Sequence, residues 1–394
     1  MTDGPRPLNL REIAEGLRSP HTSEARPRRV APLLPASRAD ELARWLAGTQ
    51  DRDVAVPLDR VRLVVFAGDH GVAARGISRL EPGWTASAVR DLVAGRGPVA
   101  ALAAQVGARV EVHAVGVDWG ARGPVDVPAS VLAGALHPSG DIAREDALTE
   151  AEVEDAVRAG AAVADAAVDA GVDLLVLGDL GVGATAVAST VVAVCLRKGA
   201  VDVVGRGSGI DDDAWMRKTA AVRDAVRRGR KLATRPTAVL QAVGSADVAA
   251  AVGFLLRSAA RRTPVLLDGS LGTAAALLAS RGVPGAEKWW RLGAATAEPA
   301  QALASERLKL PPVLELGAGR GGGAGALAAV GVLRAAQALA AADEAELPPL
   351  PEAEPEPQPE AEPEAEAEAE AEAEAEAEPQ PEAGPGEEST RPNV

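Results

Sequence analysis

Short apolar runs alternate along most of the chain with longer, alanine-rich amphipathic stretches. In two of these stretches, Glu150–Ala170 and Asp211–Arg230, apolar residues recur at helical spacing. A glycine, often with an aspartate, follows each apolar run before the next helical pattern. This order of strand, turn and helix predicts βαβ units, a parallel sheet and an α/β fold. Helices on both faces of such a sheet explain strands that are apolar throughout. The predicted strands are Val61–Ala67, Val110–Val117, Asp173–Leu177, Val201–Val204 and Thr263–Leu267.

The same pattern divides the chain into three parts. Residues 1–36 are rich in Pro, Arg and Ser, show no clear periodicity and are expected to be a loose lead-in. Ala39–Leu46 has helical spacing and begins the folded body, which we expect to span 37–342 as one α/β domain. From 343 to 394 the chain is dominated by Glu, Pro and Ala. Few apolar residues and charge of a single sign predict a disordered acidic tail, with solubilisation as its simplest role.

Charge is distributed unevenly between these parts. The net charge is −15, but residues 343–394 contain 19 acidic residues and one basic residue, Arg391. The rest of the chain therefore has 37 acidic and 40 basic residues and is nearly neutral. Neither part has the dense basic face that nucleic-acid binding requires, so no nucleic-acid partner is expected.

Cysteine and histidine usage argues against a metal or disulfide framework. Cys195 is the only cysteine, which rules out an intrachain disulfide. No two of the four histidines (His21, His70, His113 and His137) lie at helical ligand spacing, so no metal site is expected.

No targeting or membrane segment is evident in the sequence. The N-terminus lacks the apolar core of a secretory signal. The longest apolar runs, Ala184–Leu196 and Gly321–Leu333, are shorter than the ~20 residues of a membrane span. We expect a cytoplasmic protein with no membrane partner.

Four glycine-rich turns follow predicted strands directly: Gly68–Gly71, Gly178–Gly183, Gly205–Gly209 and Asp268–Gly272. In open parallel sheets, ligands bind beyond the carboxyl ends of the strands, where such turns gather. Glycine allows the backbone to approach a ligand closely, and a helix that begins at the turn favours a phosphate. The turns are therefore expected to form one composite site for an anionic ligand.

Three polar positions near these turns have both a functional and a structural interpretation. Lys218 is a candidate phosphate ligand, or else a solvated surface lysine. Asp268 is a candidate acceptor for a ribose hydroxyl, or else a residue that shapes the turn at the strand end. Asp69 and His70 are candidate acid–base groups, with helix N-capping by Asp69 as the alternative.

Five ordered sequence blocks carry a family resemblance. They are VVFAGDHGVAARGIS (Val64–Ser78), GDLGVGATA (Gly178–Ala186), VGRGSGIDDDAWMRK (Val204–Lys218), LQAVG (Leu240–Gly244) and LLDGSLGTAAALLA (Leu266–Ala279). Together they resemble the nicotinate-nucleotide:dimethylbenzimidazole phosphoribosyltransferases of cobalamin lower-ligand synthesis. The order and spacing of the blocks hold from about Ala39 to Ala340.

The resemblance implies a fold and a reaction. It implies a Rossmann-like sheet flanked by helices, a small helical subdomain, a homodimer, and no metal or other cofactor. It also implies transfer of the phosphoribosyl group of nicotinate mononucleotide to 5,6-dimethylbenzimidazole or a related base. The products would be nicotinate and an α-ribazole phosphate.

The resemblance also assigns ligand-binding positions. Ser78 and Ser87 would lie at the base pocket, with Ser87 near the position of a family glutamine. Asp179 stands where the family has a glutamate. The residues implied for nucleotide and phosphate are Asp179, Gly181, Gly183, Gly205, Gly207, Lys218 and Asp268.

Departures from the family concentrate on ligand-facing loops. The closing signature is LGAGRGGGAGAL (Leu316–Leu327), in which Gly322 stands at the catalytic glutamate. Gly319 stands at the family's arginine, with Arg320 beside it. Ala184-Thr185 replaces Asn-Thr in the phosphate loop, and Ala294–Thr296 replaces His-Arg-Ser before Glu298-Pro299.

The identity of the general base is therefore open at the level of the sequence. Glu315, Asp69 and His70 are candidates, and spacing does not choose between them. Two functions follow: a phosphoribosyltransferase with altered base chemistry, or a catalytically impaired paralogue that binds a nucleotide or a base.

Overall fold

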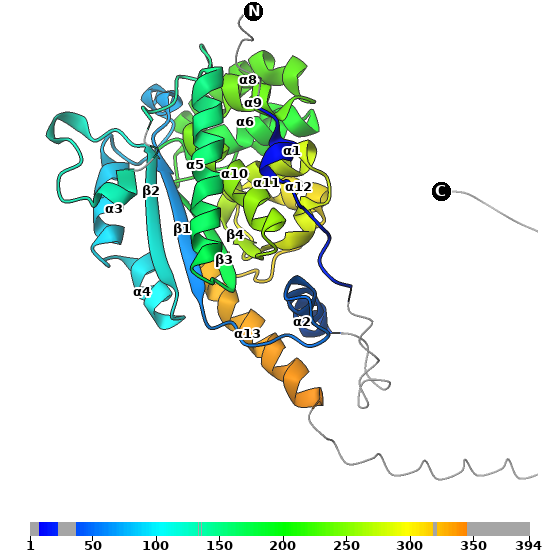
Figure 1. The fold of residues 1–394 in the computed structure, drawn as a ribbon. Helices are drawn as coiled ribbons and strands as arrows, with labels where there is room; N and C mark the ends of the chain where they lie inside the picture. The colour runs from blue at the N-terminus through cyan, green and yellow to red at the C-terminus, as the bar shows by residue number, and fades with distance from the viewer. Residues whose placement is uncertain (1–7, 23–36, 133, 135, 318–320, 345–394) are drawn as a thin grey trace, which may run out of the picture. The chain divides into compact units, whose positions relative to one another are not determined.

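A five-stranded, fully parallel sheet forms the centre of the fold, in the order β2-β1-β3-β4-β5 (Figure 1). This computed structural model describes residues 8–22, 37–132, 134, 136–317 and 321–344. The strands are β1 (Val61–Gly68), β2 (Arg109–Gly116), β3 (Leu174–Leu180), β4 (Val265–Leu267) and β5 (Trp290–Leu292). The parallel α/β fold predicted from the alternating pattern is confirmed.

Each central strand supplies two separate hydrophobic cores, one on each face of the sheet. In β1, Val64 and Phe66 point into the first core, whereas Leu63 and Val65 point into the second. All eight residues of β1 are buried. A strand enclosed on both sides has no polar face, which is why the sequence shows a continuous apolar run here.

The first core is covered by α5 (Glu150–Asp169) and α10 (Ala246–Ala260), which pack closely against each other and, through α10, against β1 and β2. A Cβ on Gly160 would lie 1.8 Å from the Ala250 carbonyl oxygen, so only glycine permits this helix crossing. A reciprocal capping box between Thr149 and Glu152 starts α5. Further helices on this side are α6 (Ala184–Leu196), α7 (Ala200–Val203), α8 (Asp212–Gly229), α9 (Pro236–Val243), α11 (Gly269–Gly282) and α12 (Pro299–Leu308).

The second core lies under α2 (Arg38–Thr49), α3 (Trp84–Val93), α4 (Pro98–Gln105) and α13 (Ala324–Glu344). In Figure 1, α3 and α4 flank β2, and α13 lies beside α2. Short 3-10 helices complete the structure: η2 (Gly71–Arg75), η3 (Gly120–Arg122), η4 (Ala129–Leu132), η5 (Arg230–Leu232) and η6 (Ala286–Trp289).

Helix α13 is long and apolar enough to cross a membrane by length and composition alone. Its inward residues Leu327, Val330 and Leu333 are completely buried against the sheet and α2. The helix thus fills the second core, as an apolar helix of a layered α/β protein does.

Three expectations from the sequence differ from the structure. Val201–Val204 is not a strand, because Ala200–Val203 forms the short helix α7, in which Val203 is buried among helices. The fifth strand is instead Trp290–Leu292, a three-residue segment too short to show a strand pattern. Residues 8–22, part of the expected lead-in, include α1 (Leu10–Ile13), whose Leu10 is buried in the first core.

The acidic tail expected at 343–394 lies outside the described residues, apart from Asp343 and Glu344 at the end of α13.

Candidate functional site

The strand order creates one switch point, between β1 and β3. From β1 the chain moves outward to β2 and then returns to place β3 on the other side of β1. Ligands of open α/β sheets bind in the crevice beyond the carboxyl ends of the strands at such a point. Here, that edge holds Asp69 and His70 after β1, Asp179 at the end of β3 and Asp268 after β4.

Asp69 and His70 are held firmly by the protein. One carboxylate oxygen of Asp69 accepts from the Thr85 hydroxyl at 2.5 Å, and the other accepts from the Asp118 amide at 2.9 Å. The buried His70 ring uses both nitrogens. Nδ1 lies 2.9 Å from the Val182 carbonyl oxygen, and Nε2 lies 3.3 Å from the Asp247 carboxylate. The N-capping role considered for Asp69 is not seen, because the carboxylate ties two loops together instead.

The net effect of the surroundings raises the pKa of His70. Burial is the largest influence and acts to lower it, but the Asp247 carboxylate and the Val182 carbonyl together outweigh burial. Asp247 is itself completely buried and also accepts from the Ser245 hydroxyl and the Val248 amide. No sequence pattern pointed to Asp247, because it lies near the start of α10 and outside the four glycine-rich turns.

Asp179 has very different surroundings. No described residue donates a hydrogen bond to its carboxylate, and nearby groups are mostly negative. Burial is the main cause that raises the pKa of Asp179 to about 7. The Asp268 and Asp247 carboxylates raise it further, and His70 acts in the opposite direction. The residue remains partly exposed to solvent.

Asp268 joins the end of β4 to the beginning of α13. Its two carboxylate oxygens accept from the Gly323 amide at 3.1 Å and the Ala326 amide at 2.9 Å. Burial raises the pKa of Asp268 to about 6, although these amide donors act to lower it. A carboxylate at a helix N-terminus is favoured by the free amides and the helix dipole. The side chain therefore caps α13 rather than shaping its own turn.

Three consecutive glycines, Gly321, Gly322 and Gly323, precede α13, and all have positive φ. The Gly322 amide donates to the Asp179 carbonyl at 3.0 Å, which places the glycines against the end of β3. Gly322, the position that the resemblance assigns to the catalytic glutamate, thus lies next to the backbone of Asp179. Gly319 and Arg320 lie outside the described residues.

The second part of the site is the glycine loop at 205–209. The Gly207 amide donates to Glu298 Oε1 at 2.7 Å, and a Cβ on Gly205 would lie 2.5 Å from the same oxygen. Lys218 Nζ donates to Thr185 Oγ1 at 2.8 Å and to the Gly205 carbonyl at 3.0 Å, with Glu298 Oε2 at 3.9 Å.

Lys218 is therefore not a surface residue, since its side chain is 1% exposed. Burial lowers the pKa of Lys218, and Glu298 opposes that effect. In the sequence, Glu298 stands out only as the residue before Pro299. Its position at the start of α12, beside a Pro, gave no indication that it would reach the glycine loop.

Gly181 and Gly183 pack against the end of β1 and the segment that follows it, residues 69–83, called the β1 loop below. A Cβ on Gly181 would lie 2.1 Å from the Gly68 carbonyl oxygen, and one on Gly183 would lie 3.1 Å from His70 Cβ. Gly183 is the N-cap of α6, and Thr185 in the first turn of α6 binds Lys218. Helix α6 therefore connects the acidic edge of the sheet to the glycine loop.

The two residues assigned to the base pocket differ in their surroundings. Ser78 Oγ lies 3.3 Å from Ser208 Oγ, which brings the β1 loop onto the glycine loop. Ser87 is exposed on α3 and has no hydrogen bond to Ser78. Glu315 is also exposed, in the segment that leads into the closing signature.

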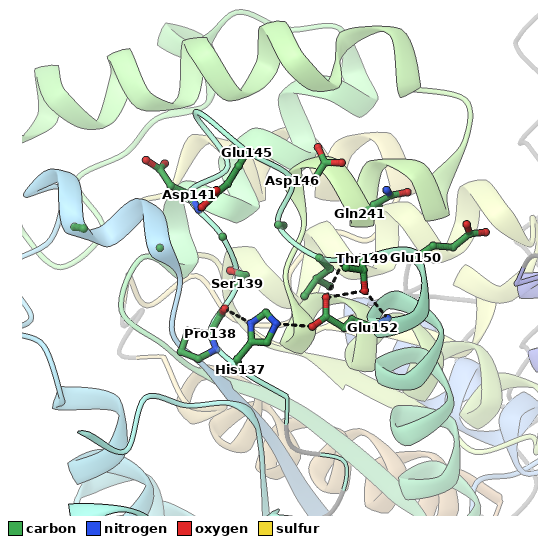
Figure 2. Close-up of a pocket in the computed structure, with 15 residues that line it drawn as sticks. His137, Pro138, Ser139, Asp141, Glu145, Asp146, Thr149, Glu150, Glu152 and Gln241 are labelled. Carbon is green, nitrogen blue, oxygen red and sulfur yellow. Dashed lines mark hydrogen bonds and ion pairs between the residues drawn. The ribbon is translucent and has the colours of Figure 1, made fainter. Parts of the chain in front are cut away.

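A separate pocket of about 760 Å³ lies beside the start of α5, between the loop that precedes the helix and Gln241 (Figure 2). In Figure 2, the His137 ring points toward Glu152, and their Nε2 and Oε1 atoms are 2.5 Å apart. Apart from Gly71, at the end of the first glycine-rich turn, no residue predicted for the site lines this pocket. Within the described residues, no group of three or more His, Cys, Asp or Glu side chains is arranged to hold a metal ion.

Comparison with known proteins identifies the family of the chain. A family model described as phosphoribosyltransferase matches residues 22–346, which places the chain in that class of enzymes. A nicotinate-nucleotide–dimethylbenzimidazole phosphoribosyltransferase from Mycobacterium avium is 46% identical over 281 residues, covering 71% of this chain and 79% of the relative. Its counterpart from Mycobacterium tuberculosis is 46% identical over 280 residues, or 70% and 76% of the two chains.

Solved structures show the same relationship. The crystal structure of CobT from Thermus thermophilus superposes with a TM-score of 0.72 at 30% identity, covering 84% of this chain and 95% of that one. The chain belongs to the nicotinate-nucleotide–dimethylbenzimidazole phosphoribosyltransferase family, whose members act in cobalamin lower-ligand synthesis.

Proposed function

We propose that the protein transfers the phosphoribosyl group of nicotinate mononucleotide to 5,6-dimethylbenzimidazole or a related base, releasing nicotinate and α-ribazole phosphate. The observation that carries this proposal is the junction of the 205–209 loop, buried Lys218 and the first turn of α6 at Thr185. Backbone amides, a lysine and a helix N-terminus are the groups that hold a phosphate. The β1 loop meets the same junction through Ser78 and Ser208.

In this proposal, the nucleotide lies across the carboxyl edge of the sheet. Gly181, Gly183, Gly205, Gly207 and Lys218 would hold its phosphate and ribose, with Asp179 and Asp268 at the far end of the site. Ser78 and Ser87 would face the incoming base. Holding both reactants in one geometry supplies a large part of such a transfer without any cofactor.

The direct test is a transfer assay. Purified protein is incubated with nicotinate mononucleotide and 5,6-dimethylbenzimidazole, and nicotinate and α-ribazole phosphate are measured by liquid chromatography with mass detection. Equal release of both products is expected. Release of nicotinate without the benzimidazole would indicate hydrolysis and contradict the proposal.

A second candidate function is ligand binding without turnover. The observation that favours it is Gly322, which offers no side chain where the family has its catalytic carboxylate. Calorimetric binding of nicotinate mononucleotide, together with no product at any pH, would support this function over the first.

We also propose a cytoplasmic homodimer, on the basis of the family. Light scattering coupled to size-exclusion chromatography tests the dimer, and a mass of one chain would contradict it.

A further inference from the structure

The position of the family's catalytic glutamate carries no side chain here, and the three candidates taken from the sequence are poorly placed. Glu315 is exposed to solvent. Both Asp69 oxygens accept hydrogen bonds from Thr85 and Asp118, and both His70 ring nitrogens are engaged by protein groups. A general base needs an atom free to take a proton from the ligand.

We propose that Asp179 is the general base of this protein and replaces the glutamate that is missing at Gly322. This assignment rests on the proposed function, because it needs an acceptor base whose N–H proton is removed. It differs from the ligand-holding role that the resemblance gives to position 179, because here Asp179 acts on the reacting atoms.

The geometry places the backbone of Asp179 next to Gly322, the position that the resemblance gives to the missing glutamate. Asp179 is at the end of β3, and its carbonyl accepts from the Gly322 amide at 3.0 Å. Glycine also borders the carboxylate itself, since a Cβ on Gly269 would lie 3.3 Å from Asp179 Oδ1. The residue is partly exposed, and no described residue donates to its carboxylate. The carboxylate of this partly exposed residue therefore has unused acceptor capacity with which to receive a ligand N–H.

Each of the other acids at this edge accepts at least one hydrogen bond from the protein, and the oxygens left without a donor, Asp247 Oδ2 and Glu298 Oε2, are buried. Asp268 accepts from amides at the start of α13, and Asp247 accepts from Ser245 and Val248 while facing His70. Glu298 binds the Gly207 amide. Among the carboxylates that line this edge in the described residues, Asp179 alone lacks a hydrogen-bond donor.

The step balances with these groups alone. Asp179 takes the N–H proton of the benzimidazole, and the benzimidazole nitrogen forms a bond to the anomeric carbon of the ribose. The bond from that carbon to the nicotinate nitrogen breaks, and its electron pair neutralises the pyridinium. Nicotinate leaves, and the proton on Asp179 passes to water.

The charges that face Asp179 suit it to this role. Burial, together with the Asp268 and Asp247 carboxylates, raises the pKa of Asp179 to about 7, while His70 acts to lower it. A base with a pKa near the working pH is ionised to a useful extent and still binds a proton well.

The test uses the full-length protein with nicotinate mononucleotide and 5,6-dimethylbenzimidazole between pH 5.5 and 8.5. For the unmodified enzyme, kcat/KM should rise with pH about a midpoint near 7. Asp179→Asn should lower kcat by about 10²–10⁴-fold, the range that general-base catalysis supplies, and should abolish the rise. Asp179→Glu should keep the rise at a reduced rate, and added formate should partly restore Asp179→Ala.

Rescue by formate separates a base from a structural residue, because a small carboxylate restores a missing proton acceptor but not a packing contact. Calorimetric binding of nicotinate mononucleotide to Asp179→Asn should be within about threefold of the unmodified protein. Glu315→Gln tests the rival residue and should leave the pH profile unchanged.

The possible negative results distinguish a wrong assignment of the general base from a wrong proposed function. If the unmodified enzyme turns over and Asp179→Asn matches its rate and pH profile, the assignment of the base is wrong and the proposed function stands. Loss of the pH-dependent rise in Glu315→Gln would also overturn the assignment. If the unmodified protein releases no nicotinate under any condition, both the proposed function and the assignment are wrong.

Discussion

The two halves of the candidate site differ in how their charges are satisfied. At the 205–209 loop, the Lys218 ammonium has two hydrogen-bond acceptors and a carboxylate nearby, and that carboxylate in turn binds the Gly207 amide. At the end of β3, no described residue donates a hydrogen bond to the Asp179 carboxylate, which faces two other acids. One half is a nearly closed network, in which Glu298 Oε2 is the atom left without a hydrogen bond from a described residue, whereas the other half holds a carboxylate in unfavourable surroundings.

This difference indicates that the two halves have different functions, one in ligand binding and the other in proton transfer. A closed network fixes the position of groups that hold a ligand, because each member limits the motion of the next. An unsatisfied acid has a raised pKa and can exchange a proton near neutral pH, which structural ion pairs do not need. Variants that act on only one half should therefore alter either binding or proton transfer.

The largest expected effect concerns the contact between Gly181, just after β3, and the end of β1. Gly181→Ala places a Cβ 2.1 Å from the Gly68 carbonyl oxygen and 2.9 Å from the His70 ring. Because the first of these atoms belongs to the backbone of the central strand, we expect a loss of about 3 kcal/mol or more of unfolding free energy, the upper range for overpacking. Urea denaturation measures it.

Gly331→Ala is the matched control, since it lies at an exposed position of α13 where a Cβ meets no atom within 4 Å. This control should be neutral or gain about 0.5–1 kcal/mol. Equal stability of Gly181→Ala and the unmodified protein would show that the β1 and β3 loops lie further apart than described.

The next effect concerns the closed network. Lys218→Met should cost roughly 2–3 kcal/mol of stability, because it removes charged hydrogen bonds and leaves Glu298 buried without its cation. It should also weaken the binding of nicotinate mononucleotide by about 1.5–3 kcal/mol. Both effects are measured on one preparation, by thermal melting and calorimetry.

The double variant Lys218→Met/Glu298→Gln should recover part of the stability, because the uncompensated carboxylate is gone. It should not recover binding. If the double variant is no more stable than Lys218→Met, Lys218 and Glu298 are not energetically coupled.

The sequence predicted those helices and strands whose structure follows from the hydrophobic pattern of the segment itself. The continuous apolar run Val61–Ala67 and the helical periodicity of Glu150–Ala170 are both local signals, and both segments formed elements of the expected type. Val201–Val204 is equally apolar, but its environment is helices rather than the sheet, which no local pattern records. The predicted run Thr263–Leu267 contains the short strand β4, whereas the three-residue strand β5 is too short for a pattern to emerge.

The location of the site could be predicted from the sequence, but the hydrogen-bond partners of its residues could not. The rule for parallel sheets and the glycine-rich turns brought Asp69, Asp179 and Asp268 to one edge. The partners that decide their chemistry, Asp247 and Glu298, come from helices α10 and α12, whose approach is set by packing. Sequence spacing also could not reveal that Asp69 and His70 are already hydrogen-bonded on both sides.

The acidic half makes a prediction about pH. Asp179 and Asp268 have folded-state pKa values of about 7 and about 6, against an ordinary value of 3.8. The folded state thus binds protons more tightly than the unfolded chain. Stability contributed by the protonated acids should be fully present below about pH 4 and lost as the pH rises to about 7.

Replacing Asp179 with the neutral Asn should remove part of the loss of folding stability at high pH. At pH 8, Asp179→Asn should be more stable than the unmodified protein by roughly 2 kcal/mol. Each pKa unit corresponds to about 1.4 kcal/mol. The expected difference is smaller than the full shift would give, because solvent screens this partly exposed residue. The difference should vanish near pH 4. A destabilised Asp179→Asn at pH 8 would mean that the carboxylate has a donor after all.

The smallest expected effect concerns Gly322, where the resemblance alone suggests that a glutamate would restore activity. In the structure, Gly322 has a φ of 67°, and a Cβ there would lie 3.0 Å from Val99 Cγ2. We expect Gly322→Glu to cost about 1–2 kcal/mol of stability through backbone strain and to leave kcat no higher than before. In a Val99→Ala background the steric part should fall while the strain remains, so the double variant should be more stable than the sum of the two single changes predicts. Thermal melting of the four proteins measures this coupling, and the transfer assay measures kcat. A tenfold or greater rise in kcat for Gly322→Glu would show that the loop before α13 can present a carboxylate to the ligand, and that the family's base position remains usable alongside Asp179.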